Sequence, residues 1–206
     1  ENSDIFFAAI GGAGLLGIVT EITLQLIKIP SPYLSIKNST ATSLEELMRG
    51  LDNATKNDSY AIAQIDCFSD GNMLGRGTIH AGSFVSDILN KKSVEEMRSI
   101  SKMMFLIFPK KLIPIFGKYF LNDFMMRWIS RLKYYLDKNI GPKKPFVQDI
   151  FQFTFLLDQV KDWKNSFRLG FFEYEPLVPK ENAQEVFKQL IALGNEYDMP
   201  SYLSAI

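Results

Sequence analysis

The sequence predicts an α+β fold with a mainly antiparallel sheet and flanking helices, and the order of its segments carries that prediction. From Tyr33 onward the segments read as strand, helix, strand, strand, helices, strand, strand, helix and strand. Strand–helix–strand units therefore recur twice, which is typical of a ferredoxin-like arrangement. The chain has 206 residues and 47% hydrophobic content, which is enough for a core of this kind.

A proline-containing break divides the chain near its start. Ile29–Pro32 holds two prolines, which end strand pairing, so we place a domain boundary there. Residues 1–29 then belong to one domain and residues 30–206 to a second. The second domain is expected to be incomplete, because a strand-like segment that starts near Ser201 stops abruptly.

The first half of the second domain reads as a strand, a helix and a hairpin. Thr42 or Ser43 can cap the helix, and Glu45 and Glu46 in its first turn favour its dipole. Two strand-like runs on either side of a Ser-Asp-Gly-Asn turn predict a hairpin. The predicted strands are Tyr33–Lys37, Tyr60–Phe68 and Met73–Ala81.

The second half is predicted to contain helices and further strands. Residues from about 92 to 138 look helical, with Pro109 and Pro114 dividing the region. The remaining predicted elements are a strand over Phe146–Phe155, a short helix over Asp158–Trp163, a strand over Gly170–Pro179 and an amphipathic helix over Pro179–Tyr197.

A glycine-rich turn near the N-terminus matches the pattern G-x-G-x-x-G through Gly12, Gly14 and Gly17. A Rossmann site needs such glycines after a strand and before a helix. Here a short helix, Asp4–Ile10, precedes them, and a β-branched strand, Ile18–Leu26, follows them. The reversed order argues against nicotinamide binding in the Rossmann manner.

The same stretch resembles a flavin-domain signature. Ile5–Thr20 is similar to the pattern (L/I)F(W/F)A…GGxGxxGIVT of the vanillyl-alcohol oxidase superfamily of FAD-linked oxidases. The resemblance implies that the glycines let the backbone pass close to FAD and that the following residue touches it. The residues assigned to FAD binding on this basis are Gly12, Gly14, Gly17 and Ile18.

A later stretch extends the resemblance. FQFTFLLDQVKDWKNSFRLGFFEYEPLVP, at 151–179, resembles the decaprenylphosphoryl-β-D-ribose oxidase and alditol-oxidase-like members of that superfamily, and Leu74-Gly75-Arg76 fits the same group. The resemblance implies that residues 1–29 are the last helix, turn and strand of an FAD-binding domain. Residues 30–206 would then be a substrate-binding cap. We expect this piece by itself to bind no flavin and to have no turnover.

Two glutamates are the candidate catalytic residues. Glu173 and Glu175 are two apart on a predicted strand, so their side chains share one face. The resemblance implies that this face looks across the flavin at the substrate and hydrogen-bonds its hydroxyls. The decaprenylphosphoryl-ribose enzymes carry glutamine at both positions, which leaves a sugar, a polyol and a polyprenyl-phosphate sugar open as substrates. The alternative interpretation is a solvated outer strand face.

The sequence offers no set of metal ligands. His80 is the only histidine and has no cysteine, aspartate or second histidine at ligand spacing. It reads as a hairpin residue, and it could act as a base only if it faced the same cleft as Glu175. Cys67, the only cysteine, reads as a half-buried strand residue rather than a reactive thiol.

A basic, aromatic segment is the remaining unusual feature. Residues 101–140 hold eight lysines or arginines against Asp123 and Asp137, with aromatic residues and methionines between them. Three interpretations stay open: helices packed on the cap with snorkelling lysines, a face that lies on a membrane surface, and a lid or partner-docking pair. A formal net charge of zero gives no general indication of nucleic-acid binding.

Two functions follow from these observations. The first is an FAD-dependent oxidoreductase that moves a hydride from a sugar, polyol or lipid-linked sugar to flavin N5. The second is a non-catalytic α+β interaction module with a membrane- or partner-binding arm over residues 101–138. We expect a cytoplasmic location, with peripheral membrane contact through that arm. The longest apolar runs fall short of the roughly 20 residues that a spanning helix needs.

Overall fold

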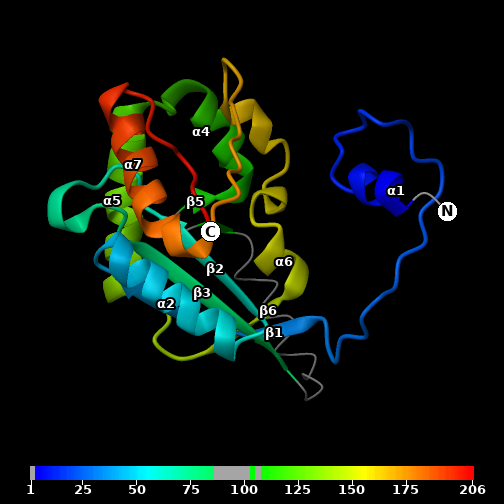
Figure 1. Cartoon of the computed structure of the whole chain (residues 1–206). Coiled ribbons are helices and arrows are strands. Elements are labelled where there is room, and N and C mark those ends of the chain that lie inside the picture. Colours follow the sequence, from blue (N-terminus) through cyan, green and yellow to red (C-terminus); the bar gives the residue numbers. More distant parts are fainter. Residues whose placement is uncertain (1–2, 86–102, 105–107) are drawn as a thin grey trace.

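The computed structural model describes residues 3–85, 103–104 and 108–206 (Figure 1). Within them, the body of the fold is a four-stranded antiparallel sheet with strand order β2-β3-β1-β6. The predicted α+β class, with its antiparallel sheet and flanking helices, is confirmed. The strands are β1 (Tyr33–Ala41), β2 (Tyr60–Ile65), β3 (Gly77–Phe84) and β6 (Phe146–Asp149).

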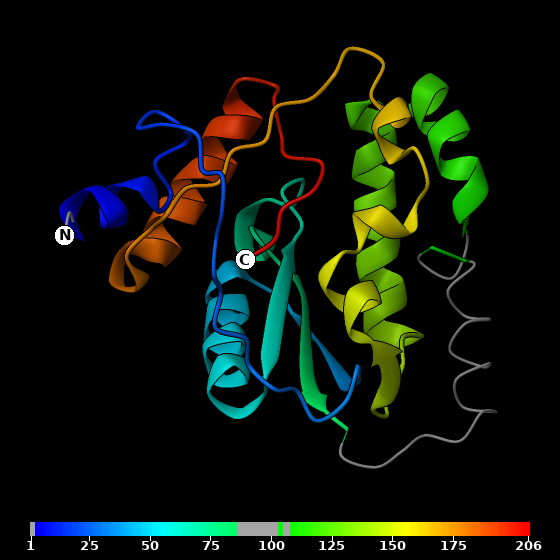
Figure 2. The same cartoon turned by 90° about the vertical axis from the view of Figure 1, so that its right-hand side faces the viewer.

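Two helices cover one face of this sheet, as Figure 2 shows: α2 (Leu44–Asn57) and α7 (Ala183–Glu196). Alternate strand residues such as Ala63 and Ile79, which lie opposite each other in the β2–β3 register, point to these helices. Leu47 of α2 is completely buried among them. This layer forms the larger of the two core clusters in the described part of the chain.

The other face is covered by α5 (Asp123–Asn139) and α6 (Ile150–Thr154), which lie on the opposite side of the sheet from α2 in Figure 2. Leu34 and Ile36 of β1 point to this side and pack with Phe153 of α6. The shorter α4 (Ile113–Phe120) packs against a 3₁₀ turn at 163–166. Helices therefore cover both faces of the sheet and shield the apolar side chains between sheet and helices from water.

The predicted start of α2 and the predicted hairpin are confirmed. The Ser43 hydroxyl accepts a hydrogen bond from the Glu46 amide, and the Glu46 carboxylate accepts from the Thr42 amide at 2.7 Å. The arrangement resembles a capping box, except that the Glu46 carboxylate accepts from Thr42, the residue before the N-cap Ser43. The Thr42 hydrogen bonds lower the pKa of Glu46. β2 and β3 pair antiparallel around a turn in which Gly71 and Gly75 take positive φ angles of 55° and 66°.

The N-terminal segment forms the predicted helix, α1 (Ser3–Ala9), and the predicted glycine turn, but the predicted strand Ile18–Leu26 is wrong. Residues 13–30 are all exposed and carry no strand hydrogen bonds (Figure 1). The alternating pattern is present, but a strand also needs a neighbouring strand to satisfy its backbone groups. None of the described residues provides that neighbour for Ile18–Leu26.

The predicted strand Gly170–Pro179 is wrong for the same reason: the segment is largely exposed, and no strand among the described residues pairs with it. The predicted strand Phe146–Phe155 ends at Asp149, whose carboxylate accepts a hydrogen bond from the Phe151 amide and so caps α6. The predicted final strand is only a short stretch: Ile206 and Ala63 exchange two backbone hydrogen bonds at the outer edge of β2.

The helices predicted over 92–138 are present in part as α4 and α5, whereas residues 92–102 and 105–107 lie outside the described residues. The predicted helix Asp158–Trp163 is instead two 3₁₀ turns, and the predicted C-terminal helix is α7. The remaining elements are the strands β4 (Met103–Met104) and β5 (Phe108–Pro109) and the 3₁₀ turns Gly71–Met73, Lys110–Leu112, Leu157–Gln159, Trp163–Ser166 and Lys180–Asn182. In the described part of the chain, no helix has both the length and the apolar character needed to cross a membrane.

Candidate functional site

The two candidate catalytic glutamates lie on the extended segment before α7. Both Glu173 and Glu175 are exposed, and their neighbours Phe172 and Leu177 are fully exposed as well. No hydrogen bond or ion pair among the described residues joins either carboxylate to the glycine turn. The structure therefore does not bring these two groups of predicted residues together.

The glycine turn has the backbone freedom that close approach to a ligand requires. Gly14 and Gly17 have φ angles of 75° and 145°, and a β-carbon built on either would meet nothing within 4 Å. A β-carbon on Gly12 would lie 2.6 Å from the Ala8 carbonyl oxygen, so that glycine is required by the turn itself. Ile18 follows with an exposed side chain. The backbone is therefore open at Gly14 and Gly17, while Leu15 and Leu16 between them carry exposed apolar side chains.

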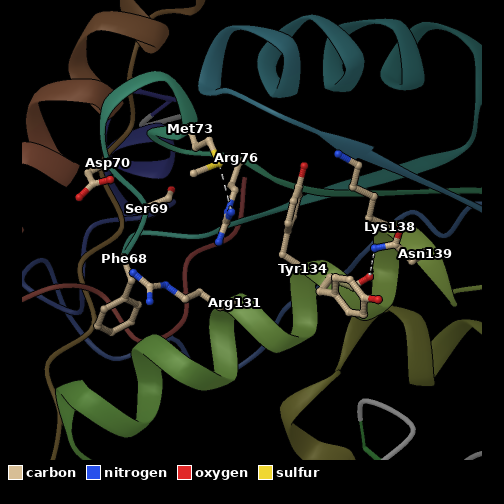
Figure 3. Close-up of a pocket in the computed structure, with 10 residues that line it drawn as sticks. Phe68, Ser69, Asp70, Met73, Arg76, Arg131, Tyr134, Lys138 and Asn139 are labelled. Atoms are coloured by element: carbon tan, nitrogen blue, oxygen red, sulfur yellow. Dashed lines mark hydrogen bonds between the residues drawn. The ribbon is translucent and has the colours of Figure 1, made fainter.

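The structure also assembles a cleft that the sequence did not predict (Figure 3). Its volume is about 560 Å³, and it lies between the β2–β3 connection and α5. Ligand sites commonly fall in this size range. The lining residues are Phe68, Ser69, Asp70, Met73, Arg76, Arg131, Tyr134, Tyr135, Lys138 and Asn139.

A buried ion pair forms the back of this cleft. Arg76 Nε donates to Asp66 Oδ2 at 2.9 Å, and only 11% and 6% of the two side chains are exposed. The other carboxylate oxygen, Oδ1, accepts from the Phe68 amide at 3.0 Å. Asp66 thus ties both ends of the β2–β3 connection together and fixes the Arg76 guanidinium in place.

Tyr134 connects this ion pair to α5. The guanidinium carbon of Arg76 lies 4.4 Å from the centre of the Tyr134 ring, and Lys138 Nζ lies 5.9 Å from it. In Figure 3 the ring stands between these two side chains. A tyrosine with its ordinary pKa of 10 already keeps its proton at neutral pH, and partial burial raises the pKa of the Tyr134 phenol further.

The sequence contained a signal for this cleft. Arg131, Tyr134, Tyr135 and Lys138 are spaced by three, one and three, which places them on one side of a helix. The sequence predicted only a basic, aromatic helix here, because the β2–β3 connection that forms the other wall of the cleft is distant in sequence. The ion pair between Asp66 and Arg76, which lie ten residues apart around the hairpin, was not predicted from the sequence.

His80 lies beneath α5 and away from the two glutamates. Its Nδ1 is 2.9 Å from the Asn38 side-chain oxygen, and its Nε2 is shielded from solvent with no hydrogen-bond partner among the described residues. The pKa of His80 is lowered to about 4, mainly by burial and also by the nearby Lys133, while Asp137 opposes the shift. No group of three metal-ligating side chains occurs among the described residues.

Cys67 is buried just after β2. Its Sγ lies 3.3 Å from the Ser204 hydroxyl oxygen. Burial raises the pKa of this thiol, which disfavours the reactive thiolate. The interpretation of Cys67 as a structural residue fits this position.

Comparison with known proteins adds a relationship that the geometry alone does not give. No protein-family model matches the chain. Decaprenylphosphoryl-β-D-ribose oxidase of Mycolicibacterium smegmatis is 30% identical over 193 residues, which are 92% of this chain and 40% of that protein. An uncharacterized protein in the mprA 5′ region of Streptomyces coelicolor is 39% identical over 79 residues, which are 38% of this chain and 22% of that protein. The chain is therefore similar to an oxidase over nearly its whole length, and it spans 40% of the length of that oxidase.

Proposed function

We propose that the full-length protein is an FAD-dependent oxidoreductase that oxidises a hydroxyl group of a sugar, a polyol or a polyprenyl-phosphate sugar. The observation that carries this proposal is the 30% identity, over 92% of the chain, to an oxidase named for a lipid-linked ribose. The similarity extends over 92% of the chain and so includes most of the α+β body. Residues 1–29 would then complete an FAD-binding domain, and residues 30–206 would form the cap over the substrate.

The glycine turn is the part of this chain that would contact the cofactor. Gly12 allows the turn to close, while Gly14 and Gly17 leave the backbone open to a planar ligand. Ile18 offers an exposed apolar side chain beside it. When bound, FAD supplies the redox chemistry by accepting a hydride at N5.

Glu175 and Glu173 would position the substrate. A carboxylate accepts hydrogen bonds and cannot donate them, so it suits the hydroxyl groups of a sugar or polyol. Both side chains are exposed in the described chain, which leaves them accessible to such a molecule. A glutamate that also takes the hydroxyl proton would need burial, by substrate or a further domain, to raise its pKa.

The visible absorption spectrum of the purified full-length protein tests this function. We expect flavin bands that bleach when a suitable sugar or polyol is added without oxygen. Glu175→Gln should keep the bands and slow the bleaching about 100-fold, because one substrate-positioning or proton-accepting group is worth roughly 10²–10⁴ in rate. Glu196→Gln, at an exposed glutamate of α7, is the matched control and should bleach at the normal rate. A colourless, well-folded protein would exclude the flavoenzyme.

We propose binding to anionic membranes as a second function, on the basis of the exposed face of α5. Phe124, Trp128 and Tyr135 are 70%, 56% and 58% exposed, and their spacing places them on one side of the helix. Arg131 and Lys138 flank them. Aromatic side chains beside basic ones are typical of helices that lie at a membrane surface.

Sedimentation with phosphatidylserine vesicles over a salt series tests the second function. We expect binding at low salt and release at high salt, because salt screens the attraction to anionic lipid. Phe124→Ser combined with Trp128→Ser should abolish binding. Phe151→Ser, at a similarly exposed phenylalanine of α6, should not change it. Equal sedimentation of all variants would contradict a role for this face.

A further inference from the structure

We propose that the cleft between the β2–β3 connection and α5 binds the phosphate group of an organic phosphate. Three cations line it, Arg76, Arg131 and Lys138, against the single carboxylate of Asp70. The cleft thus has an excess of positive charge in a chain whose formal net charge is zero. Phosphate binding there does not depend on whether the protein is an oxidoreductase.

Arg76 and Arg131 differ in whether another group of the protein already pairs with their charge. Arg76 is held by Asp66, so its charge is largely compensated and its position is fixed. Arg131 makes no hydrogen bond or ion pair within the described part of the chain, although it reaches toward Phe68 in Figure 3. A free guanidinium presents a planar fork of donors that matches the geometry of a phosphate. Arg131 is therefore the residue expected to carry most of the affinity.

Neutral donors complete the site. Tyr134 keeps its phenolic proton and stands between Arg76 and Lys138. Tyr135 offers a second phenol at the rim, where it is 58% exposed. A phosphate monoester carries three strong acceptor oxygens and close to two negative charges at neutral pH, so it can use several donors at once. A carboxylate, with two oxygens and one charge, would leave donors unused.

The size of the cleft indicates an organic phosphate rather than the free ion. A volume of about 560 Å³ exceeds what one phosphate group fills. Phe68 and Met73 provide apolar wall for the rest of the molecule. The ligand could therefore be a soluble phosphate ester or the phosphate headgroup of a lipid, and experiment distinguishes these two sources.

Titration calorimetry on the full-length protein tests the site with inorganic phosphate and with glycerol 3-phosphate at constant ionic strength. We expect both ligands to bind and the ester to bind more tightly. Arg131→Gln and Lys138→Gln should each weaken binding about tenfold, the usual size for one charge-assisted contact. Lys188→Gln, which removes one charge from the exposed side of α7, should change binding less than about twofold.

A vesicle experiment identifies the source of the phosphate. Binding to phosphatidic acid vesicles but not to phosphatidylcholine vesicles, with loss in Arg131→Gln, would support a lipid phosphate. Binding of glycerol 3-phosphate without vesicle binding would support a soluble ester. The site is overturned if neither ligand form binds, or if Arg131→Gln and Lys138→Gln bind as tightly as Lys188→Gln.

Discussion

Asp66→Ala is expected to lower the free energy of unfolding by about 3–5 kcal/mol, the usual cost of removing one partner from a buried ion pair. The substitution leaves the Arg76 guanidinium without its carboxylate, and 11% of that side chain is exposed. It also leaves the Phe68 amide without its acceptor. Urea unfolding followed by circular dichroism measures the change.

Arg49→Ala is the matched control for Asp66→Ala, because it also breaks an ion pair but at the surface. Arg49 and Glu45 lie 3.8 Å apart on α2, and their side chains are 73% and 69% exposed. An exposed pair of this kind contributes about 0.5 kcal/mol or less. If Asp66→Ala costs as little as Arg49→Ala, the ion pair does not hold the β2–β3 connection in place.

Acidification from pH 6.5 to about 4 is expected to remove about 3 kcal/mol of stability through His80. The unfolded histidine has its ordinary pKa of 6.5, whereas burial lowers the folded value to about 4. Between these values the unfolded state binds more protons, so falling pH favours unfolding. Each pKa unit corresponds to about 1.4 kcal/mol. The stabilisation is complete above pH 6.5 and is lost on the way down to about pH 4.

Urea unfolding at half-unit pH steps, in the wild type and in His80→Gln, measures this contribution. Lys133 and Asp137 of α5 both act on His80, and the Asn38 side chain contacts its Nδ1. Carboxylates with lowered pKa, such as Glu46, lose their contribution only at pH values below their ordinary 4.5. A slope above pH 5 therefore reports His80, and the same slope in His80→Gln would contradict this assignment.

Elements with local signals could be predicted from the sequence. Ser43 caps α2 by accepting from the Glu46 amide, and this signal needs only residues within one turn of the helix. The hairpin of β2 and β3 needs a turn between two strand-like segments that follow each other in sequence. Both signals act over a few residues, and both predictions are confirmed.

Elements that depend on distant partners could not be predicted in the same way. Ile18–Leu26 and Gly170–Pro179 have the alternation of strands, but neither has a neighbouring strand among the described residues. The apolar run after Phe146 could not be divided by pattern alone, since strand and helix both accept it. The Asp149 side chain decides the division by capping α6.

In the candidate site, too, local features could be predicted from the sequence and features that depend on distant residues could not. The sequence predicted the glycine turn, and its backbone angles agree with that prediction. The assignment of Glu173 and Glu175 to a catalytic role stays a prediction. The basic cleft was not predicted, because it forms only where α5 packs beside the β2–β3 connection.

The sequence by itself determined the α+β class, the capped helix α2, the hairpin and the glycine turn, because each depends on residues that are close together along the chain. Only the tertiary structure decided that helices cover both faces of the sheet and that Arg76, Tyr134 and Arg131 line one cleft. Arg76 lies far from Arg131 and Tyr134 in sequence, and the packing of α5 on the sheet is what brings it to them. Hydrophobic burial brings α5 to the sheet, and the charges that gather at its edge follow from that contact.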